Sequence, residues 1–327
     1  MNQIQLMRRD IAEKLKRRET LFVIDIINAC SLRCPSCPIG TYGTRGGRLM
    51  PFDLWKLILD KAQRETKISH AQMYSFSDAC LHPELHRFVQ EATDRKIGTY
   101  MSTMLQRTRC SFAKVIEARP TEFRVSMPGW KHMAYYQKGA KPELFDKTFA
   151  EVMRLPRHKE TLWSMVFHWY KDNLDEFPAV KKLAEDNGLK LVVIPAIFMI
   201  PEKIVSGEYT EQEKELISRL LETPEECVAG MKERTTNYCQ CWDQITIDSQ
   251  GDVMLCQLVY EDRFKLMSFL DNPISEIRKA IRSHSFCSGC LAKGVNAYNE
   301  LYADFTVSED PIGDMDRFHK KERFLPR

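Results

Sequence analysis

Short apolar segments alternate with amphipathic segments through the first two thirds of the chain. The apolar segments are rich in β-branched and aromatic residues, which predicts strands at 21–27, 71–76, 98–104, 122–127, 162–169 and 190–194. Between them apolar residues recur at intervals of three and four, which predicts helices around 54–59, 85–92, 112–116, 144–153 and 177–184. This alternation indicates parallel strands joined by crossover helices. We therefore predict an α/β fold with a partial (β/α)6 TIM-like barrel, because a full barrel needs more units.

The two ends of the chain depart from this alternation. Residues 3–18 place apolar residues at helical spacing and predict a helix with a basic outer face. After about residue 198 a charged helix is predicted at 211–222, and then a hairpin in which 242–248 and 253–260 flank a Ser-Gln-Gly-Asp turn. The predicted parts are an N-terminal helix (1–20), the barrel (21–200), a linker helix region (201–236), a small C-terminal α+β module (237–294) and a C-terminal tail (295–327).

Composition and charge exclude several classes of protein. The 327 residues are 43% hydrophobic and 28% charged, which is typical of a globular chain rather than a disordered one. Lys and Arg number 48 against 45 Asp and Glu, so the net charge of +3 does not favour nucleic acid as a partner. Neither a bilayer-spanning apolar segment nor a secretory leader is evident, so we expect a cytoplasmic protein without a membrane partner.

The eleven cysteines call for a specific explanation. In a reducing cytosol they are not expected to form disulfides, and an odd number cannot pair completely, so metal or cluster ligation is favoured. One group is Cys30, Cys34 and Cys37, and a second is Cys239, Cys241, Cys256, Cys287 and Cys290. Cys80, Cys110 and Cys227 are isolated, and we interpret them as ordinary thiols.

The first cysteine group has the spacing C-x3-C-x2-C and directly follows the first predicted strand. Chance would give this spacing roughly 0.01 times in such a chain, and the carboxyl end of a barrel strand is where barrel enzymes hold their chemistry. Three thiolate ligands leave one iron of a 4Fe-4S cluster open. Structural zinc takes four ligands, and the nearest further Cys or His residues are His70 and Cys80.

This segment resembles the radical S-adenosylmethionine (SAM) superfamily, in which a C-x3-C-x2-C loop follows the first strand of a partial (β/α)6 barrel. The resemblance covers roughly residues 20–200. It implies that SAM chelates the open iron and that an electron from the cluster cleaves SAM to a 5′-deoxyadenosyl radical, which abstracts a hydrogen from the substrate. It also implies an external electron donor of the flavodoxin or ferredoxin type.

Later strand ends resemble the SAM-binding positions of the same family. Asp78, in the segment 75–85, stands for the Glu that holds the SAM amino group. The segments 102–103, 124–126 and 193–195 resemble those that contact the rest of SAM. The implied SAM contacts are Ser36, Ser75, Ser77, Asp78, Ser102, Thr103, Ser126 and Ile194. Two positions depart from the family: Ser36 stands where an aromatic residue is usual, and the two glycines before the family's Glu are absent. For the Ser and Thr residues at the strand ends, the alternative role is to cap the following helix.

The second cysteine group resembles the twitch module, the shortened form of the SPASM domain that holds one auxiliary 4Fe-4S cluster. The matching features are Gly251-x4-Cys256, the pair Cys287-x2-Cys290, and one earlier cysteine, for which we favour Cys239 over Cys241. The resemblance thus implies two 4Fe-4S clusters in total. A four-cysteine zinc ribbon has the same ligand count, so the alternative of another class is a zinc-binding structural or interaction protein.

The substrate is expected to be a small molecule. The loop 40–48 should overhang the barrel mouth as a lid, an anion site or a plain turn, and no catalytic residue is identified. The substrate-contact candidates are Tyr42, Arg45, Tyr74, Arg124 and His168. A fully ligated second cluster can accept an electron, so the first hypothesis is two-electron oxidation of a small polar metabolite in a biosynthetic pathway, which resembles the aminocyclitol dehydrogenases. The alternative is radical peptide modification, epimerisation or rearrangement, although only about twenty residues precede the first strand.

Overall fold

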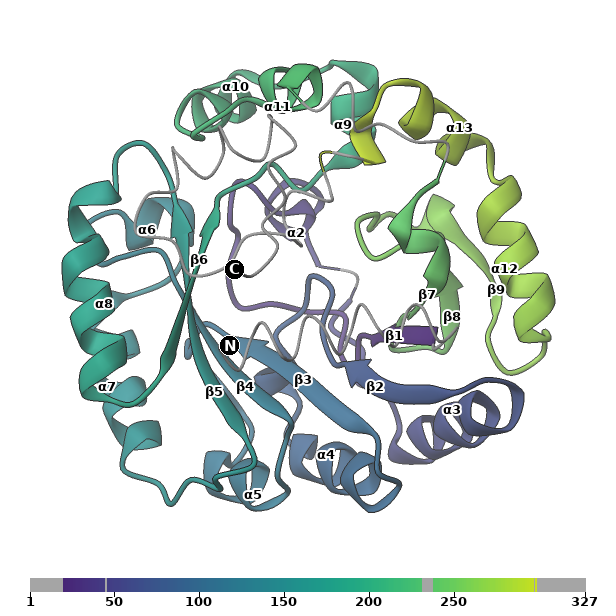
Figure 1. The fold of residues 1–327 in the computed structure, drawn as a ribbon, viewed down its shortest axis with the longest axis horizontal. Helices are drawn as coiled ribbons and strands as arrows, with labels where there is room; N and C mark the ends of the chain where they lie inside the picture. The colour runs from purple at the N-terminus through teal and green to yellow at the C-terminus, as the bar shows by residue number, and fades with distance from the viewer. Residues whose placement is uncertain (1–19, 45, 231–237, 297, 299–327) are drawn as a thin grey trace, which may run out of the picture.

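The computed structural model describes residues 20–44, 46–230, 238–296 and 298 (Figure 1). The helix predicted at 3–18, the candidate Arg45 and most of the predicted tail lie outside these residues. Within the described ranges, no helix combines the length and the hydropathy that a bilayer crossing requires.

The described strands form one nine-stranded sheet in the order β6-β5-β4-β3-β2-β1-β7-β8-β9. Its first six strands in chain order run parallel: β1 (Thr20–Ile24), β2 (Ile68–Gln72), β3 (Gly98–Thr103), β4 (Glu122–Met127), β5 (Leu162–Trp169) and β6 (Lys190–Pro195). The sheet curves around a centre while helices cover its outer side (Figure 1). The predicted α/β fold with a partial TIM-like barrel is confirmed.

The helices of the barrel lie on the outer side of the sheet because each has one apolar face. In α4, Leu85, Phe88, Val89 and Ala92 recur at helical spacing and are buried. The barrel helices are α3 (Phe52–Glu65), α4 (Leu85–Asp94), α5 (Phe112–Glu117), α7 (Pro142–Met153) and α8 (Phe177–Asp186). The other helices are α2 (Pro38–Tyr42), α6 (Met133–Tyr136), α9 (Pro201–Ser206), α10 (Glu211–Ser218), α11 (Pro224–Gly230), α12 (Ile274–Ser283) and α13 (Ser285–Ala292), with short 3-10 turns η1 (Ala79–Leu81), η2 (Leu174–Glu176), η4 (Gln240–Asp243) and η5 (Asp262–Phe264).

The barrel strands place polar side chains on the inner side of the sheet. In β4, Phe123 and Val125 are buried in the core between the sheet and the outer helices, whereas Arg124 and Ser126 line a cavity. Because side chains alternate between the two faces of a strand, polar residues at every second position collect inside the barrel.

The C-terminal strands extend the barrel sheet. The predicted hairpin forms as β7 (Gln244–Ile247) and β8 (Asp252–Met254), but β7 pairs in parallel with β1, and β9 (Lys265–Ser268) adds an antiparallel edge. The second hairpin strand is shorter than predicted because the chain leaves the ladder after Met254. The boundaries proposed from the sequence for the linker and the C-terminal module stay predictions.

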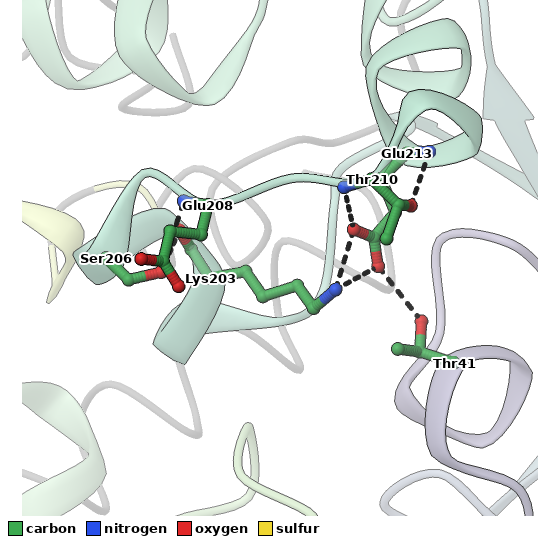
Figure 2. Close-up of polar contacts among 6 residues, drawn as sticks. All are labelled: Thr41, Lys203, Ser206, Glu208, Thr210 and Glu213. Atoms are coloured by element: carbon green, nitrogen blue, oxygen red, sulfur yellow. Dashed lines mark hydrogen bonds and ion pairs between the residues drawn. The ribbon is translucent and has the colours of Figure 1, made fainter.

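A buried ion pair ties α2, which follows the first cysteine group, to α9 and α10 (Figure 2). Lys203 Nζ lies 2.7 Å from both carboxylate oxygens of Glu213. Glu213 Oε2 also accepts a hydrogen bond from the Thr210 backbone N–H at 2.8 Å, while Thr41 Oγ1 donates to Glu213 Oε1 at 3.4 Å. Glu213 is 5% exposed. Its carboxylate therefore accepts hydrogen bonds from three segments at a position where water could not serve as the acceptor instead.

Replacing Glu213 with alanine is expected to lower the free energy of unfolding by about 3 kcal/mol. The substitution leaves Lys203 largely buried without its partner and removes the capping box of α10. Anaerobic denaturant titration measures the effect. The control is Glu211→Ala, which removes an exposed acidic residue from the first turn of the same helix and should change stability by less than about 0.5 kcal/mol. Equal losses in the two variants would show that the ion pair contributes nothing specific.

Candidate functional site

A cavity of about 1040 Å³, including its open mouth, lies at the carboxyl ends of the six parallel strands. Residues that follow or end each of these strands contribute to its wall, from Cys30 after β1 to Met199 after β6. That volume includes solvent at the mouth, so the cavity is open to ligands from the side of the strand ends.

The first cysteine group lines this cavity. Cys30, Cys34 and Cys37 are each partly buried and all belong to its wall. Burial raises the pKa of Cys30 to about 12 and the pKa of Cys37 to about 11, and it also raises the pKa of Cys34. Within the described ranges, no three His, Cys, Asp or Glu side chains are arranged to hold a single metal ion. Three thiols on one cavity wall fit an iron–sulfur cluster by their donor type and leave a fourth side open.

Backbone contacts fix the loop that carries these cysteines. Cys37 N–H donates to the Cys34 carbonyl at 3.0 Å, and Met199 N–H donates to the Ser36 carbonyl at 2.9 Å. A Cβ at Gly40 would lie 2.0 Å from the Cys34 carbonyl oxygen, so a side chain at this position would displace the loop. The short α2 and the segment after β6 thus hold the loop from two sides.

Asp78 and Thr103 meet on the cavity wall near Cys30, where the Asp78 N–H donates to the Ala29 carbonyl at 3.1 Å. Asp78 Oδ1 accepts from Cys80 N–H at 2.9 Å, and Thr103 Oγ1 donates to Asp78 Oδ2 at 3.0 Å. Asp78 is only 3% exposed, and burial raises its pKa to about 6. These bonds orient a carboxylate on the cavity wall, where it can face a cationic group of a ligand.

The sequence did not single out Asp25, which supports this region. It accepts a hydrogen bond from Ser75 N–H at 2.8 Å and another from the Ser77 hydroxyl. The Ser75 hydroxyl itself donates to the Gln257 carbonyl at 2.7 Å, across to the C-terminal strands. A lone carboxylate at this position has no spacing that marks it in the sequence.

Most of the predicted contact residues come together at this cavity. The predicted SAM contacts on its wall are Ser36, Ser75, Ser77, Asp78, Ser102, Thr103 and Ser126, and the predicted substrate contacts there are Tyr74, Arg124 and His168. Ile194 is instead buried in an apolar cluster, while its neighbours Ala196 and Ile197 line the cavity. Tyr42 is 38% exposed and does not belong to the lining. Thr103 Oγ1 also accepts from Leu105 N–H at 3.1 Å, a local contact of the kind that the capping alternative predicts.

The second cysteine group lines a separate small pocket. Its walls come from η4, the end of β8, α13 and Pro201, and they include all five members of the group: Cys239, Cys241, Cys256, Cys287 and Cys290. Burial raises the pKa of Cys287 to about 11, and hydrogen bonds with the thiols of Cys239 and Cys256 raise the pKa of Cys241. Five soft donors around one apolar pocket fit a fully ligated cluster. The choice between Cys239 and Cys241 stays a prediction.

Comparison with known proteins places the fold. No protein-family model and no curated protein matches the sequence. Streptococcus suis SuiB bound to precursor peptide SuiA superposes with a TM-score of 0.57 at 14% identity, over 92% of this chain and 79% of that chain. SuiB bound to S-adenosylmethionine superposes with a TM-score of 0.54 at 14% identity, over 93% of this chain and 81% of that chain. Native anSMEcpe with bound AdoMet superposes with a TM-score of 0.50 at 12% identity, over 91% of this chain and 87% of that chain.

SuiB and anSMEcpe are radical SAM enzymes. The chain has the radical SAM fold. The resemblance predicted from the C-x3-C-x2-C loop is therefore confirmed for the fold. At these identities the comparisons do not assign a substrate to this chain.

In this radical SAM fold, β4, β5 and the segment after β2 carry polar side chains into the cavity. Arg124 on β4 donates to Glu122 through two nitrogens, at 3.0 and 3.1 Å, and donates to the Tyr74 hydroxyl at 3.3 Å. His168 on β5 has Nδ1 3.4 Å from Ser126 Oγ. Burial and the nearby Arg124 lower the pKa of His168 to about 4, so its imidazole is neutral at pH 7.

A small apolar cluster packs against the first cysteine group. Ile39, Phe76 and Tyr260 form a cluster against which Cys30 and Cys37 pack. The rings of Phe76 and Tyr260 meet edge to face at a centroid distance of 5.9 Å. Met199 lines the cavity and Pro201 lines the second pocket, so the segment after β6 contributes to both thiol sites.

Proposed function

We propose that this protein is a radical SAM oxidoreductase that removes two electrons from a small polar metabolite. The observation that carries the proposal is the pair of thiol sites within one radical SAM fold, with three cysteines on the barrel cavity and five around the second pocket. The first group would hold the 4Fe-4S cluster that binds SAM. Four of the second group would hold an auxiliary 4Fe-4S cluster, in a twitch module at 237–294.

The residues of the cavity have assigned roles in this proposal. When bound, the first cluster and SAM supply a 5′-deoxyadenosyl radical that removes a hydrogen atom from the substrate. Asp78, oriented by Thr103, holds the SAM amino group, and the serines at the strand ends hold its other polar groups. Tyr74, Arg124 and His168 hold the substrate. An external donor of the flavodoxin or ferredoxin type supplies electrons.

Radical modification of a peptide is the second candidate. It is supported by SuiB, whose structure contains a precursor peptide and which superposes on this chain with a TM-score of 0.57. The cavity favours the small molecule, because its polar groups lie on the barrel wall at the strand ends.

Removing one ligand of the second cluster tests the proposed reaction. Anaerobically purified protein should contain about eight irons per chain, and Cys256→Ala about four. We expect this variant to form 5′-deoxyadenosine from SAM, while the yield of oxidised product falls at least about 100-fold because its electron acceptor is gone. Iron analysis and chromatography of both products measure these effects.

Cys110→Ala provides the control, because Cys110 lines neither thiol site. It should keep the iron content and the product yield of the wild type. Full product formation by Cys256→Ala would disprove the electron-acceptor role. Stoichiometric zinc without iron would instead support the structural zinc protein.

A further inference from the structure

Cys80 and Cys110 are isolated in the sequence, but they are neighbours in the fold. Cys80 lies in η1, and Cys110 lies in the segment between β3 and α5. The Cys80 carbonyl accepts two backbone N–H groups, from Arg109 at 2.8 Å and from Cys110 at 3.0 Å. Standard bond lengths along this contact keep the two cysteine Cα atoms within about 7 Å of each other. Cysteines whose Cα atoms lie farther apart than about 7 Å cannot form a disulfide without backbone movement, so this pair meets the first condition for one.

The side chains of this pair also meet. A hydrogen bond with the Cys110 thiol is the main cause that raises the pKa of Cys80, and burial raises it further. Both residues are free cysteines; Cys80 belongs to the apolar core cluster and Cys110 packs against it. Cys80 is 0% exposed, whereas Cys110 is only partly buried. A small molecule in solution therefore reaches Cys110 first.

Cys80 connects the pair to the carboxylate on the cavity wall. Its N–H donates to Asp78 Oδ1 at 2.9 Å. Burial raises the pKa of Asp78, and hydrogen bonds from the N–H and the thiol of Cys80 act in the opposite direction. The Cys80 thiol also has a hydrogen bond with Thr103, the residue that donates to Asp78 Oδ2. The Cys80 sulfur thus helps to orient this carboxylate from behind the cavity wall.

We propose that Cys80 and Cys110 are a dithiol site that a small disulfide, such as glutathione disulfide, converts to a protein disulfide, and that this bond weakens SAM binding. The effect on SAM rests on the proposed function. Cys110 first exchanges with the reagent, which forms a mixed disulfide and releases one glutathione as a protonated thiol. Cys80 then attacks the Cys110 sulfur, and the second glutathione leaves as a thiol with the Cys80 proton. The protein loses two protons and two electrons, and the reagent takes up both, so atoms and electrons balance.

The disulfide changes the surroundings of Asp78. It removes the hydrogen of the Cys80 thiol, so the carboxylate loses one of its donors. It also draws η1, whose N-cap residue is Asp78, toward Cys110. Hydrogen bonds to charged groups are the stronger ones, so we expect the Kd for SAM to rise about tenfold or more on oxidation. In assays that contain a reductant the pair stays as two thiols, so a Cys110 variant keeps the wild-type activity there.

The test uses anaerobic holoenzyme that is freed of reductant and then treated with glutathione disulfide. Peptide mass spectrometry without reduction should find the Cys80 peptide linked to the Cys110 peptide, with the loss of two hydrogens. Equilibrium dialysis should give a Kd for SAM about tenfold higher or more, at unchanged iron content, and dithiothreitol should restore it. Cys110→Ser should keep its untreated affinity. Cys227→Ala is the matched control, because Cys227 is buried in a different apolar cluster, and it should respond like wild type.

Three results would overturn the proposal. Glutathione attached to Cys110 without a link to Cys80 would disprove the dithiol site. A link that leaves the Kd for SAM unchanged would disprove the effect on Asp78. An equal loss of affinity in Cys110→Ser would assign that loss to other cysteines. If the reduced wild type binds no SAM, the proposed function fails, whereas the cross-link still decides whether Cys80 and Cys110 form a dithiol site.

Discussion

Replacing Cys34 with serine is expected to abolish SAM cleavage and to remove about four irons per chain. Cys34 lies between Cys30 and Cys37 on the cavity wall, and its carbonyl accepts the N–H bond that closes the loop at Cys37. Residues that only orient a metal ligand change activity by about 10- to 100-fold when they are replaced. Loss of a direct ligand from a set of three should therefore exceed about 1,000-fold.

The measurement combines iron analysis with the rate of 5′-deoxyadenosine formation under a strong reductant. Cys110→Ser is the control, since it makes the same chemical change at a partly buried cysteine outside both thiol sites. It should keep about eight irons and the wild-type rate. If Cys34→Ser kept its iron and cleaved SAM normally, the first cysteine group would not be the SAM cluster site.

The local patterns of the sequence predicted most of the barrel. The strands at 122–127 and 162–169 form with the predicted bounds, as Glu122–Met127 and Leu162–Trp169. The strand predicted at 71–76 is displaced and forms as Ile68–Gln72. The apolar pattern continues beyond the ladder because Met73 and Phe76 are buried in the following loop. Burial of a side chain and pairing of its backbone are different properties, and hydropathy reports only the first.

Local sequence patterns could not predict that β7 pairs with β1. The two strands are more than 200 residues apart, and no periodicity within either one specifies its partner. By contrast, the signal for α12 was present and missed: Ile274, Ile277 and Ile281 have helical spacing and are buried. β9 left no such signal, since all four of its residues are half-buried and do not alternate.

The sequence predicted the parts of the candidate site whose residues have a recognisable spacing. It did not predict the contacts that depend on how the strands pair. The cysteine groups stand out in the sequence, and each lines one pocket. Asp25 and Glu122 gave no such signal, because a lone carboxylate in or after a strand has no recognisable spacing. Their roles appear only when the sheet brings Ser75 to Asp25 and Arg124 to Glu122.

The attachment of the C-terminal strands to the barrel gives the proposed oxidation a spatial basis. The ring pair of Phe76 and Tyr260 comes from the end of β2 and from the segment after β8, and it packs against Cys30 and Cys37. The parallel pairing of β7 with β1 fixes the C-terminal strands to the barrel. A second cluster would thus be held at a constant position relative to the cavity.

Replacing Asp78 with asparagine is expected to raise the Kd for SAM about 100-fold without changing the iron content. The buried carboxylate is the anionic group that would pair with the SAM ammonium, and removing one partner of such a pair costs about 2–5 kcal/mol. Equilibrium dialysis of the anaerobic holoenzyme measures the affinity. Asp186→Asn is the control, since Asp186 pairs with Lys182 on the exposed side of α8. Wild-type affinity in Asp78→Asn would show that another residue holds the SAM amino group.

The same substitution is expected to stabilise the ligand-free fold. Burial raises the pKa of Asp78 from 3.8 to about 6, so folding favours the protonated carboxyl group. The protonated Asp78 carboxyl group contributes its full stability below its pKa in the unfolded chain, and this contribution is lost as the pH rises to about 6. At pH 7 the ionisation of Asp78 therefore lowers the free energy of unfolding by an amount on the order of 3 kcal/mol. Asparagine resembles the protonated carboxyl group and removes this cost. Asp78→Asn should therefore unfold at a higher denaturant concentration than wild type at pH 7, whereas at pH 4 the difference should nearly vanish. If Asp78→Asn loses both SAM affinity and stability at pH 7, Asp78 has a structural role and does not bind SAM directly.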